Sequence, residues 1–200
     1  GRVPVKLNRD PYYTDAAFRK HPKEGFTAMF DRMLDLPEIT VQLETDFFSI
    51  QEQLNPKYGF VYTGPIDRFF DYQFGKLEWR SLEFTFKLEA APFQQECVQI
   101  NYPNEHDYTR TVEIKHVTLQ EHPQTVVSYE VPKQVGDPYY PVPNAENQER
   151  YLSYRQLADQ QDQVHFVGRL AEYTYINTDE AISKGLALAE KLKNCHIHKA

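Results

Sequence analysis

The 200-residue sequence has little of what marks several large classes of protein. Its two cysteines, Cys97 and Cys195, lie far apart and have no metal-ligand spacing. Such sparse cysteine argues against a disulfide framework and is typical of the reducing cytoplasm. No uninterrupted apolar run reaches the roughly 18 residues that a membrane-spanning helix needs, and no secretory signal pattern opens the chain. We therefore expect a cytoplasmic protein with no membrane attachment.

Basic charge and local catalytic motifs are also scarce. Lys and Arg number 22 against 29 Asp and Glu, which gives a formal net charge of −7. This balance argues against nucleic-acid binding, so an anionic ligand would have to be held by a few placed Arg and Lys residues. The sequence contains no glycine-rich dinucleotide or phosphate loop, no zinc-protease motif, no serine elbow and no paired CxxC motif. The seven histidines suggest no metal site.

Alternating apolar and polar residues dominate the middle of the chain. Four such segments, at 82–88, 98–102, 112–116 and 126–130, are separated by short polar or proline-containing turns. Consecutive strands with short links favour an antiparallel meander. With helical patterns on both sides, this predicts the α+β class: an antiparallel sheet of about four to six strands with packed helices.

The segments before and after this sheet predict helices and short strands. Together with the sheet they divide the chain into four parts. Helices are expected at 26–36, 65–72, 146–160 and 179–193, and short strands at 39–43, 60–62 and 164–167. The four parts are residues 1–60, a partial unit of sheet-edge strands and an amphipathic helix; 60–80, a linking strand, turn and helix; 81–145, the antiparallel sheet; and 146–200, a helix, a strand and the last helix.

Four blocks of sequence resemble the UDP-galactopyranose mutases, in the order expected for that family. They are YTGPIDRFFDY at 62–72 continuing to LEWRSL at 77–82, NY at 101–102 with YTR at 108–110, TVVSYE at 125–130 leading to DPYYP at 137–141, and GRLAEYTYIN at 168–177. The resemblance spans the whole chain. It implies the C-terminal portion of a longer protein, since the family's N-terminal half with its GxGxxG turn is absent. It also implies that 60–80 and the closing strand–helix unit belong to the family's FAD-binding domain.

The resemblance implies a flavoprotein isomerase that interconverts UDP-galactopyranose and UDP-galactofuranose for cell-surface polysaccharide biosynthesis. In the family, N5 of reduced FAD is the nucleophile and forms a sugar adduct as UDP leaves, so no protein residue is assigned as catalytic. UDP-galactose is the expected partner, and a homodimer is compatible with the family. The 200-residue chain alone is expected to be inactive and not to retain FAD. Two alternatives stay open: a related FAD-dependent oxidoreductase, and a non-catalytic nucleotide-sugar-binding module.

The resemblance also assigns residues to the substrate diphosphate: Arg110, Tyr140, Tyr175 and Lys6. An arginine suits a diphosphate because its planar fork makes bidentate hydrogen bonds. Lys6 stands where the family has an arginine, which keeps the charge but loses the fork. Without the resemblance, Arg110 would be interpreted as an edge-strand ion pair and the two tyrosines as packing residues. Lys6 is equally compatible with a solvated surface position.

The flavin contacts implied by the resemblance lie at the start of the last helix. Arg169 would lie beside the flavin after Gly168, which lets the backbone come close. Asn177 and Thr178 would open a helix whose free N–H groups meet the electron-rich O2 edge of the reduced flavin. Either residue would be an ordinary N-cap in any case. Arg80 fits the WRSL block but receives no role.

Overall fold

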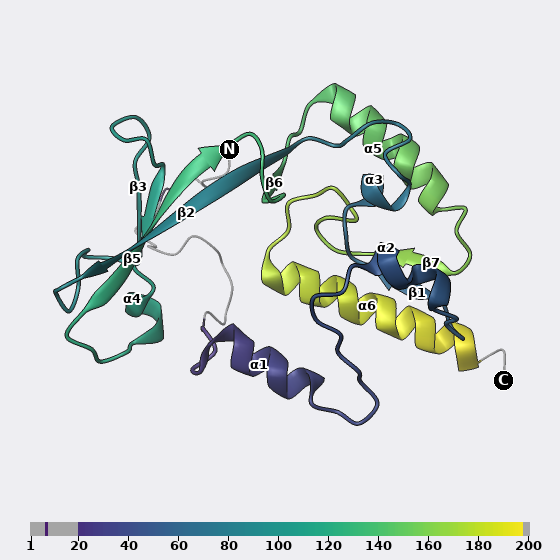
Figure 1. The fold of residues 1–200 in the computed structure, drawn as a ribbon, viewed down its shortest axis with the longest axis horizontal. Helices are drawn as coiled ribbons and strands as arrows, with labels where there is room; N and C mark the ends of the chain where they lie inside the picture. The colour runs from purple at the N-terminus through teal and green to yellow at the C-terminus, as the bar shows by residue number, and fades with distance from the viewer. Residues whose placement is uncertain (1–6, 8–19, 198–200) are drawn as a thin grey trace.

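The computed structural model describes residue 7 and residues 20–197, with side chains to residue 194. Figure 1 shows a sheet at one end of the molecule and a group of helices at the other, joined by one long strand, β2 (Trp79–Glu89). Lys6 lies outside the described residues.

The sheet is antiparallel and has five strands in the order β3-β4-β5-β2-β6. Its other strands are β3 (Gln99–Asn101), β4 (Arg110–Val112), β5 (Thr125–Lys133) and β6 (Tyr140–Pro141). The longest pairing, between β2 and β5, runs from Ser81 opposite Lys133 to Glu89 opposite Thr125. This sheet and its packed helices confirm the predicted α+β class.

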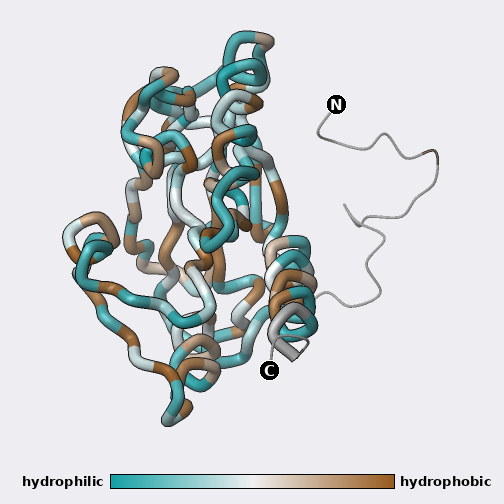
Figure 2. Tube along the Cα trace, turned by 90° about the vertical axis from the view of Figure 1, so that its right-hand side faces the viewer, coloured by the Kyte–Doolittle hydropathy of each residue, from teal (hydrophilic) through white to brown (hydrophobic). Residues whose placement is uncertain are grey.

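The helical end holds a second, two-stranded parallel sheet. Its strands are β1 (Phe60–Tyr62) and β7 (Val164–Phe166). The helices of the described residues are α1 (Gly25–Leu34), α2 (Phe47–Ile50), the 3-10 turn η1 (Gln51–Gln53), α3 (Ile66–Phe69), α4 (Lys115–Thr118), α5 (Ala145–Ala158) and α6 (Thr178–Ile197). Helix α5 starts where the Asn144 side chain caps the Asn147 amide. Figure 2 shows apolar and polar residues alternating along the chain.

The core lies at the helical end and is rich in aromatic rings. Its buried cluster, which partly buried rings surround, is Ile66, Leu77, Tyr154, Ala158 and Tyr173. Large rings each bury a large apolar area, so they are a main source of hydrophobic stabilisation at the helical end.

A buried carboxylate at the edge of this core corrects one sequence expectation. Asp67 and Asp71 lie one helical turn apart, and from sequence we expect two solvated carboxylates. Asp71 is exposed, but Asp67 is buried and accepts a hydrogen bond of 2.8 Å from the Leu77 amide. The backbone donor compensates the burial of the carboxylate.

The two faces of the five-stranded sheet differ in exposure. Cross-strand partners of an antiparallel pair lie on the same face. One face is buried at Thr111, Thr125 and Val127, which are at most 3% exposed, although Thr85 and Lys87 of β2 on the same face are exposed. The other face is open: Phe86 and Leu88 are 68% and 65% exposed.

Two strand predictions are wrong. Residues 39–43 form no strand, and Ile39, Val41 and Leu43 are all exposed. No strand among the described residues pairs with this segment, so its backbone has no neighbouring strand with which to form sheet hydrogen bonds. The strand expected at 112–116 stops at Val112, because the chain turns into α4.

The other elements fall close to their predicted positions. The brief helix expected at 65–72 is the shorter α3, while α1, α5 and α6 match the helices predicted at 26–36, 146–160 and 179–193. The apolar stripe of α1 is exposed, since no residue of that helix is buried. Within the described ranges, no helix combines the length and apolar character that a bilayer crossing requires. The four-part division of the chain stays a prediction.

Candidate functional site

Arg169 is placed by a sharp turn at the end of β7. Gly168 has a φ of +99°, a left-handed conformation that residues with a Cβ disfavour. Its amide donates to a carboxylate oxygen of Glu172 at 3.0 Å, and its carbonyl accepts from the Glu172 amide at 2.9 Å. This closed turn carries Arg169 away from the strand axis.

The Arg169 guanidinium lies against two tyrosines. Its Cζ is 4.4 Å from the ring centroid of Tyr175 and 5.2 Å from that of Tyr140. The two rings are 5.7 Å apart and nearly parallel, at 16°. An arginine over aromatic faces is held electrostatically while its N–H groups stay free to bond in the guanidinium plane. We call Tyr140, Arg169 and Tyr175 the arginine–tyrosine cluster.

One buried N–H donor of Arg169 has no hydrogen-bond partner among the described residues. Nη2 donates to the Tyr139 carbonyl. The buried donor is that of Nε. A buried donor without a partner costs free energy, of the order of 1–3 kcal/mol. Functional sites are a common place for such a cost, because a ligand oxygen can satisfy the donor.

The N-terminus of α6 follows the cluster directly. Asn177 precedes the first helical residue, Thr178, and its carbonyl accepts the first helical hydrogen bond, from the Ala181 amide. The Glu180 carboxylate binds the Asn177 amide at 2.8 Å. Asn177 and Thr178 are exposed, as an N-terminus that meets a ligand must be. Glu180 already satisfies one N–H group, so fewer are free for an anion.

Arg110 lies apart from the cluster and holds a different partner. Its guanidinium pairs with the Glu130 carboxylate on β5 at 3.2 Å, and its Nε donates to the Asn101 side chain at 3.2 Å. This is the ion pair that sequence alone suggests, but β4 lies between β3 and β5 and not at the edge of the sheet. The strand register nonetheless places Arg110 on the open sheet face, which also carries Arg80 and Tyr140.

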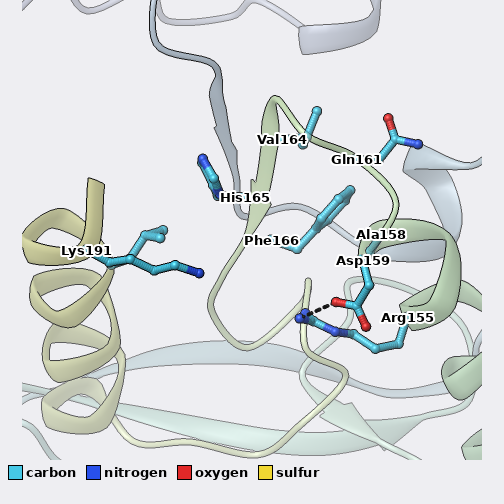
Figure 3. Close-up of a pocket in the computed structure, with 9 residues that line it drawn as sticks. Arg155, Ala158, Asp159, Gln161, Val164, His165, Phe166 and Lys191 are labelled. Atoms are coloured by element: carbon cyan, nitrogen blue, oxygen red, sulfur yellow. Dashed lines mark ion pairs between the residues drawn. The ribbon is translucent and has the colours of Figure 1, made fainter. Parts of the chain in front are cut away.

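Two hollows lie near these elements. The first, of about 250 Å³, lies between α5, β7 and α6 and contains none of the predicted site residues. Figure 3 shows Arg155 in it, paired with Asp159 at 2.7 Å. The second, of about 720 Å³, adjoins the β2–β6 pairing and is lined by residues that include Trp79 and Arg80. Arg80, which received no role from sequence, therefore borders the larger hollow.

Sequence reasoning missed Tyr173. Its hydroxyl bonds the backbone of Glu78, which directly precedes β2, and of Val142, which directly follows β6. Its left-handed φ of +43° is unusual for a residue with a large side chain. Nothing in the local sequence distinguishes it from Tyr175, since its partners are remote along the chain. Among the described residues, no group of three or more His, Cys, Asp or Glu side chains is arranged to hold a metal ion.

The fold and the cluster define an α+β protein whose candidate site combines an arginine, two tyrosines and a helix N-terminus, a set of groups suited to a phosphate-bearing ligand. A family model described as UDP-galactopyranose mutase matches residues 1–175. The chain belongs to the UDP-galactopyranose mutase family.

Individual relatives agree with this family. The chain is 36% identical to a UDP-galactopyranose mutase of Mycoplasma pneumoniae, over 96% of this chain and 53% of that protein. It is 32% identical to a dTDP-fucopyranose mutase of Escherichia coli, over 94% of this chain and 52% of that protein. A probable UDP-galactopyranose mutase of Klebsiella pneumoniae is also 32% identical, over 95% of this chain and 50% of that protein. The chain thus spans about half the length of the curated relatives that it matches.

Proposed function

We propose that the protein acts, as part of a flavin-dependent UDP-galactopyranose mutase, in the interconversion of UDP-galactopyranose and UDP-galactofuranose. The observation that carries the proposal is the arginine–tyrosine cluster, with its buried, unpartnered Arg169 Nε. The names of the two UDP-galactopyranose mutase relatives support the choice of reaction.

The residues present fit the expected FAD. A Cβ added at Gly168 would meet no atom within 4 Å, so a flat ring can approach the backbone there. Arg169 offers an unused donor beside it, and α6 begins nearby with exposed Asn177 and Thr178. When bound, reduced FAD supplies the N5 nucleophile. These residues hold only part of a dinucleotide, so the chain by itself is expected to bind FAD weakly and to lack turnover.

The chain's own residues act on the diphosphate in this proposal. The hydroxyls of Tyr140 and Tyr175 donate to its oxygens, and the Arg110 guanidinium stabilises the charge that develops as UDP leaves. Arg110 must then exchange some of its contact with Glu130 for the phosphate oxygens. Lys6 is proposed as a second cation for the same group. A cytoplasmic location and a homodimer also belong to the proposal.

A second nucleotide sugar is favoured by one relative. The Escherichia coli protein is named for dTDP-fucopyranose, and its identity to this chain equals that of the Klebsiella pneumoniae protein. A dTDP-sugar mutase is therefore the alternative substrate assignment. The cluster contacts a diphosphate in either case, so the choice between the two nucleotides lies with other residues.

The reaction is tested with the natural full-length protein, supplied with reduced FAD and UDP-galactofuranose. Formation of UDP-galactopyranose, detected by anion-exchange chromatography, would support the proposal, and the same assay with dTDP-fucopyranose tests the alternative. Substrate-dependent reduction of oxidised FAD would indicate an oxidoreductase instead. Tight nucleotide-sugar binding without turnover would indicate a binding module. The 200-residue chain assayed in parallel should show neither turnover nor FAD that survives gel filtration.

A further inference from the structure

The Tyr173 hydroxyl joins three segments that are far apart in sequence. It donates to the Glu78 carbonyl at 2.7 Å and accepts from the Val142 amide at 3.1 Å. Glu78 directly precedes β2, and Val142 directly follows β6. Tyr173 itself belongs to the segment that carries Arg169 and Tyr175. One hydroxyl group therefore links the segment of Tyr173 to the start of β2 and to the end of β6.

The two tyrosines of the cluster lie close along the chain to the residues that this hydroxyl joins. Tyr140 precedes Val142 by two residues on one side, and Tyr175 follows Tyr173 by two residues on the other. Two residues of extended chain span only about 7 Å. A displacement of the Tyr173–Val142 contact therefore passes almost directly to the separation between the Tyr140 and Tyr175 rings, against which Arg169 lies.

The pairing of β6 with β2 is short. The strand has two residues, and its residue Pro141 has no N–H group to donate. Its backbone bonds to β2 run from the Tyr139 amide to the Arg80 carbonyl at 3.1 Å and from the Val142 amide to the Glu78 carbonyl at 3.2 Å. The Tyr173 hydroxyl inserts into the second of these. Its loss would leave the Val142 amide with the Glu78 carbonyl as its one acceptor, while the Asn144 amide and the Asn147 side chain still bond the Val142 carbonyl at 2.9 and 3.2 Å.

The surroundings of Tyr173 keep its hydroxyl at this point. The residue is 3% exposed, and its ring meets Trp79 edge-to-face at 5.1 Å. Its backbone adopts the left-handed region, which persists in a non-glycine residue only where the surrounding structure enforces it. Burial raises the pKa of the Tyr173 phenol, so the hydroxyl stays a donor across the physiological range.

We infer that Tyr173 is a positioning residue for the diphosphate site: its hydroxyl sets the separation of Tyr140 from Arg169 and Tyr175. What the cluster binds rests on the proposed function, whereas how the cluster is assembled does not.

The test compares Tyr173→Phe with a matched control, Tyr154→Phe. Tyr154 is also fully buried, and its hydroxyl also bridges a backbone amide and a carbonyl, those of Phe74 and Gly75, at 3.0 and 2.8 Å. It does not contact the segment of β6. Both variants remove one hydroxyl and keep the ring, so both should lower the melting temperature by a similar few degrees.

The decisive readout is the NMR signal of the Arg169 Nε–H group in the 200-residue chain, assigned by its loss in Arg169→Lys. Ring currents from Tyr140 and Tyr175 should displace this signal in the wild type. Tyr173→Phe should move it toward the position of a free arginine, and Tyr154→Phe should leave it unchanged. An unchanged signal in Tyr173→Phe, or an equal change in both variants, would overturn the inference.

A second variant covers the case in which Tyr173→Phe does not fold. Val142→Pro removes the amide that donates both to the Tyr173 hydroxyl and to the Glu78 carbonyl, and it leaves the Tyr173 side chain intact. It should move the Arg169 signal in the same direction, and no movement would count against the inference.

UDP titration separates this inference from the proposed function. If both hold, Tyr173→Phe should weaken UDP binding about tenfold, which corresponds to ~1.4 kcal/mol, and Tyr154→Phe should not. If the wild type binds no UDP while the Arg169 signal behaves as expected, the proposed function fails and the positioning role stands. If UDP binds equally to both variants, the positioning role fails.

Discussion

The two ends of the molecule are stabilised in different ways. The helical end is held mainly by packed rings, with Tyr154 and Tyr173 buried among apolar neighbours and Asp67 as its one buried carboxylate among the described residues. The sheet end buries charges: Glu113 is fully buried and Lys115 is 5% exposed. The Lys115 ammonium binds the carbonyls of Pro92 and Gln124 at 2.8 and 3.0 Å, and that of His122 as well. The comparison shows where each kind of substitution should be most damaging.

The largest effect is expected from Lys115→Met, which removes the charge that ties three loop carbonyls together. Hydrogen bonds from a charged donor contribute roughly 1.5–3 kcal/mol each. Since some of the carbonyls will find water, we expect a loss of about 4 kcal/mol in the free energy of unfolding, measured by urea denaturation. The control is Lys133→Met, because Lys133 forms an exposed pair with Glu83 and should change stability by less than about 1 kcal/mol. Equal losses in both variants would remove the distinction between the two lysines.

Arg110→Ala should have the next largest effect, on turnover rather than on folding. Removal of a charged contact to the leaving group costs on the order of 3 kcal/mol, or about a hundredfold in kcat/KM. Arg110→Lys keeps the charge and should lose much less. The measurement is steady-state kinetics of the full-length protein with FAD. Near-normal kcat/KM for the alanine variant would leave Arg110 as the partner of Glu130 and nothing more.

A smaller effect concerns the acid stability of the sheet end. Burial alone would raise the pKa of Glu113, but the adjacent Thr125 hydroxyl and hydrogen bonds from the amides of Gln95 and Gln94 hold it below the ordinary value of 4.5. A lowered pKa contributes stability that is present above pH 4.5 and is lost as the pH falls through the folded-state value. Urea denaturation at pH 7 and pH 3 should show this loss, and Glu113→Gln should reduce the difference between the two pH values. A pH dependence that is identical in wild type and variant would exclude Glu113 as its source.

The smallest effects form a pair of opposite sign at two glycines. Gly168→Ala should destabilise by about 1–2 kcal/mol, because its φ of +99° disfavours any Cβ although the space is open. Gly185→Ala, inside α6, should stabilise by about 1 kcal/mol, because alanine favours a helix and no atom lies within 4 Å of the new Cβ. Thermal denaturation of both variants checks the signs. A stabilising Gly168→Ala would show that the turn at β7 is not strained.

The regular part of the fold could be predicted because its signals are local. The alternation at 82–88 and 126–130 lies inside β2 and β5, and the apolar spacing at 179–193 lies inside α6. The end of β4 was not predictable from alternation, since 112–116 alternates just as regularly. The chain leaves the sheet after Val112 and enters α4, where the Lys115 ammonium binds the carbonyls of Pro92 and Gln124. These carbonyls belong to other loops, so the alternation around Lys115 does not reveal them.

The candidate site was predictable only in part, for a similar reason. Resemblance supplied Arg169, Tyr140 and Tyr175, which the structure brings together, and Arg110, which it places beside Glu130 instead. Tyr173 could not be distinguished from its neighbours, because its hydroxyl bonds lie 95 and 31 residues away in sequence. Long-range backbone contacts of this kind leave no local pattern.

The central claim is that the arginine–tyrosine cluster binds the diphosphate of a nucleotide sugar. Isothermal titration of the 200-residue chain with UDP and with uridine tests it most directly, with Arg169→Ala as the variant and Arg155→Ala as the control, because Arg155 pairs with Asp159 in the separate small hollow. We expect UDP to bind and uridine to bind far more weakly. UDP affinity should fall about tenfold or more in Arg169→Ala, because Arg169 lies against the two tyrosine rings whose hydroxyls are proposed to bind the diphosphate, and should be unchanged in Arg155→Ala. Equal affinity for UDP and uridine, or undiminished UDP affinity in Arg169→Ala, would contradict the claim.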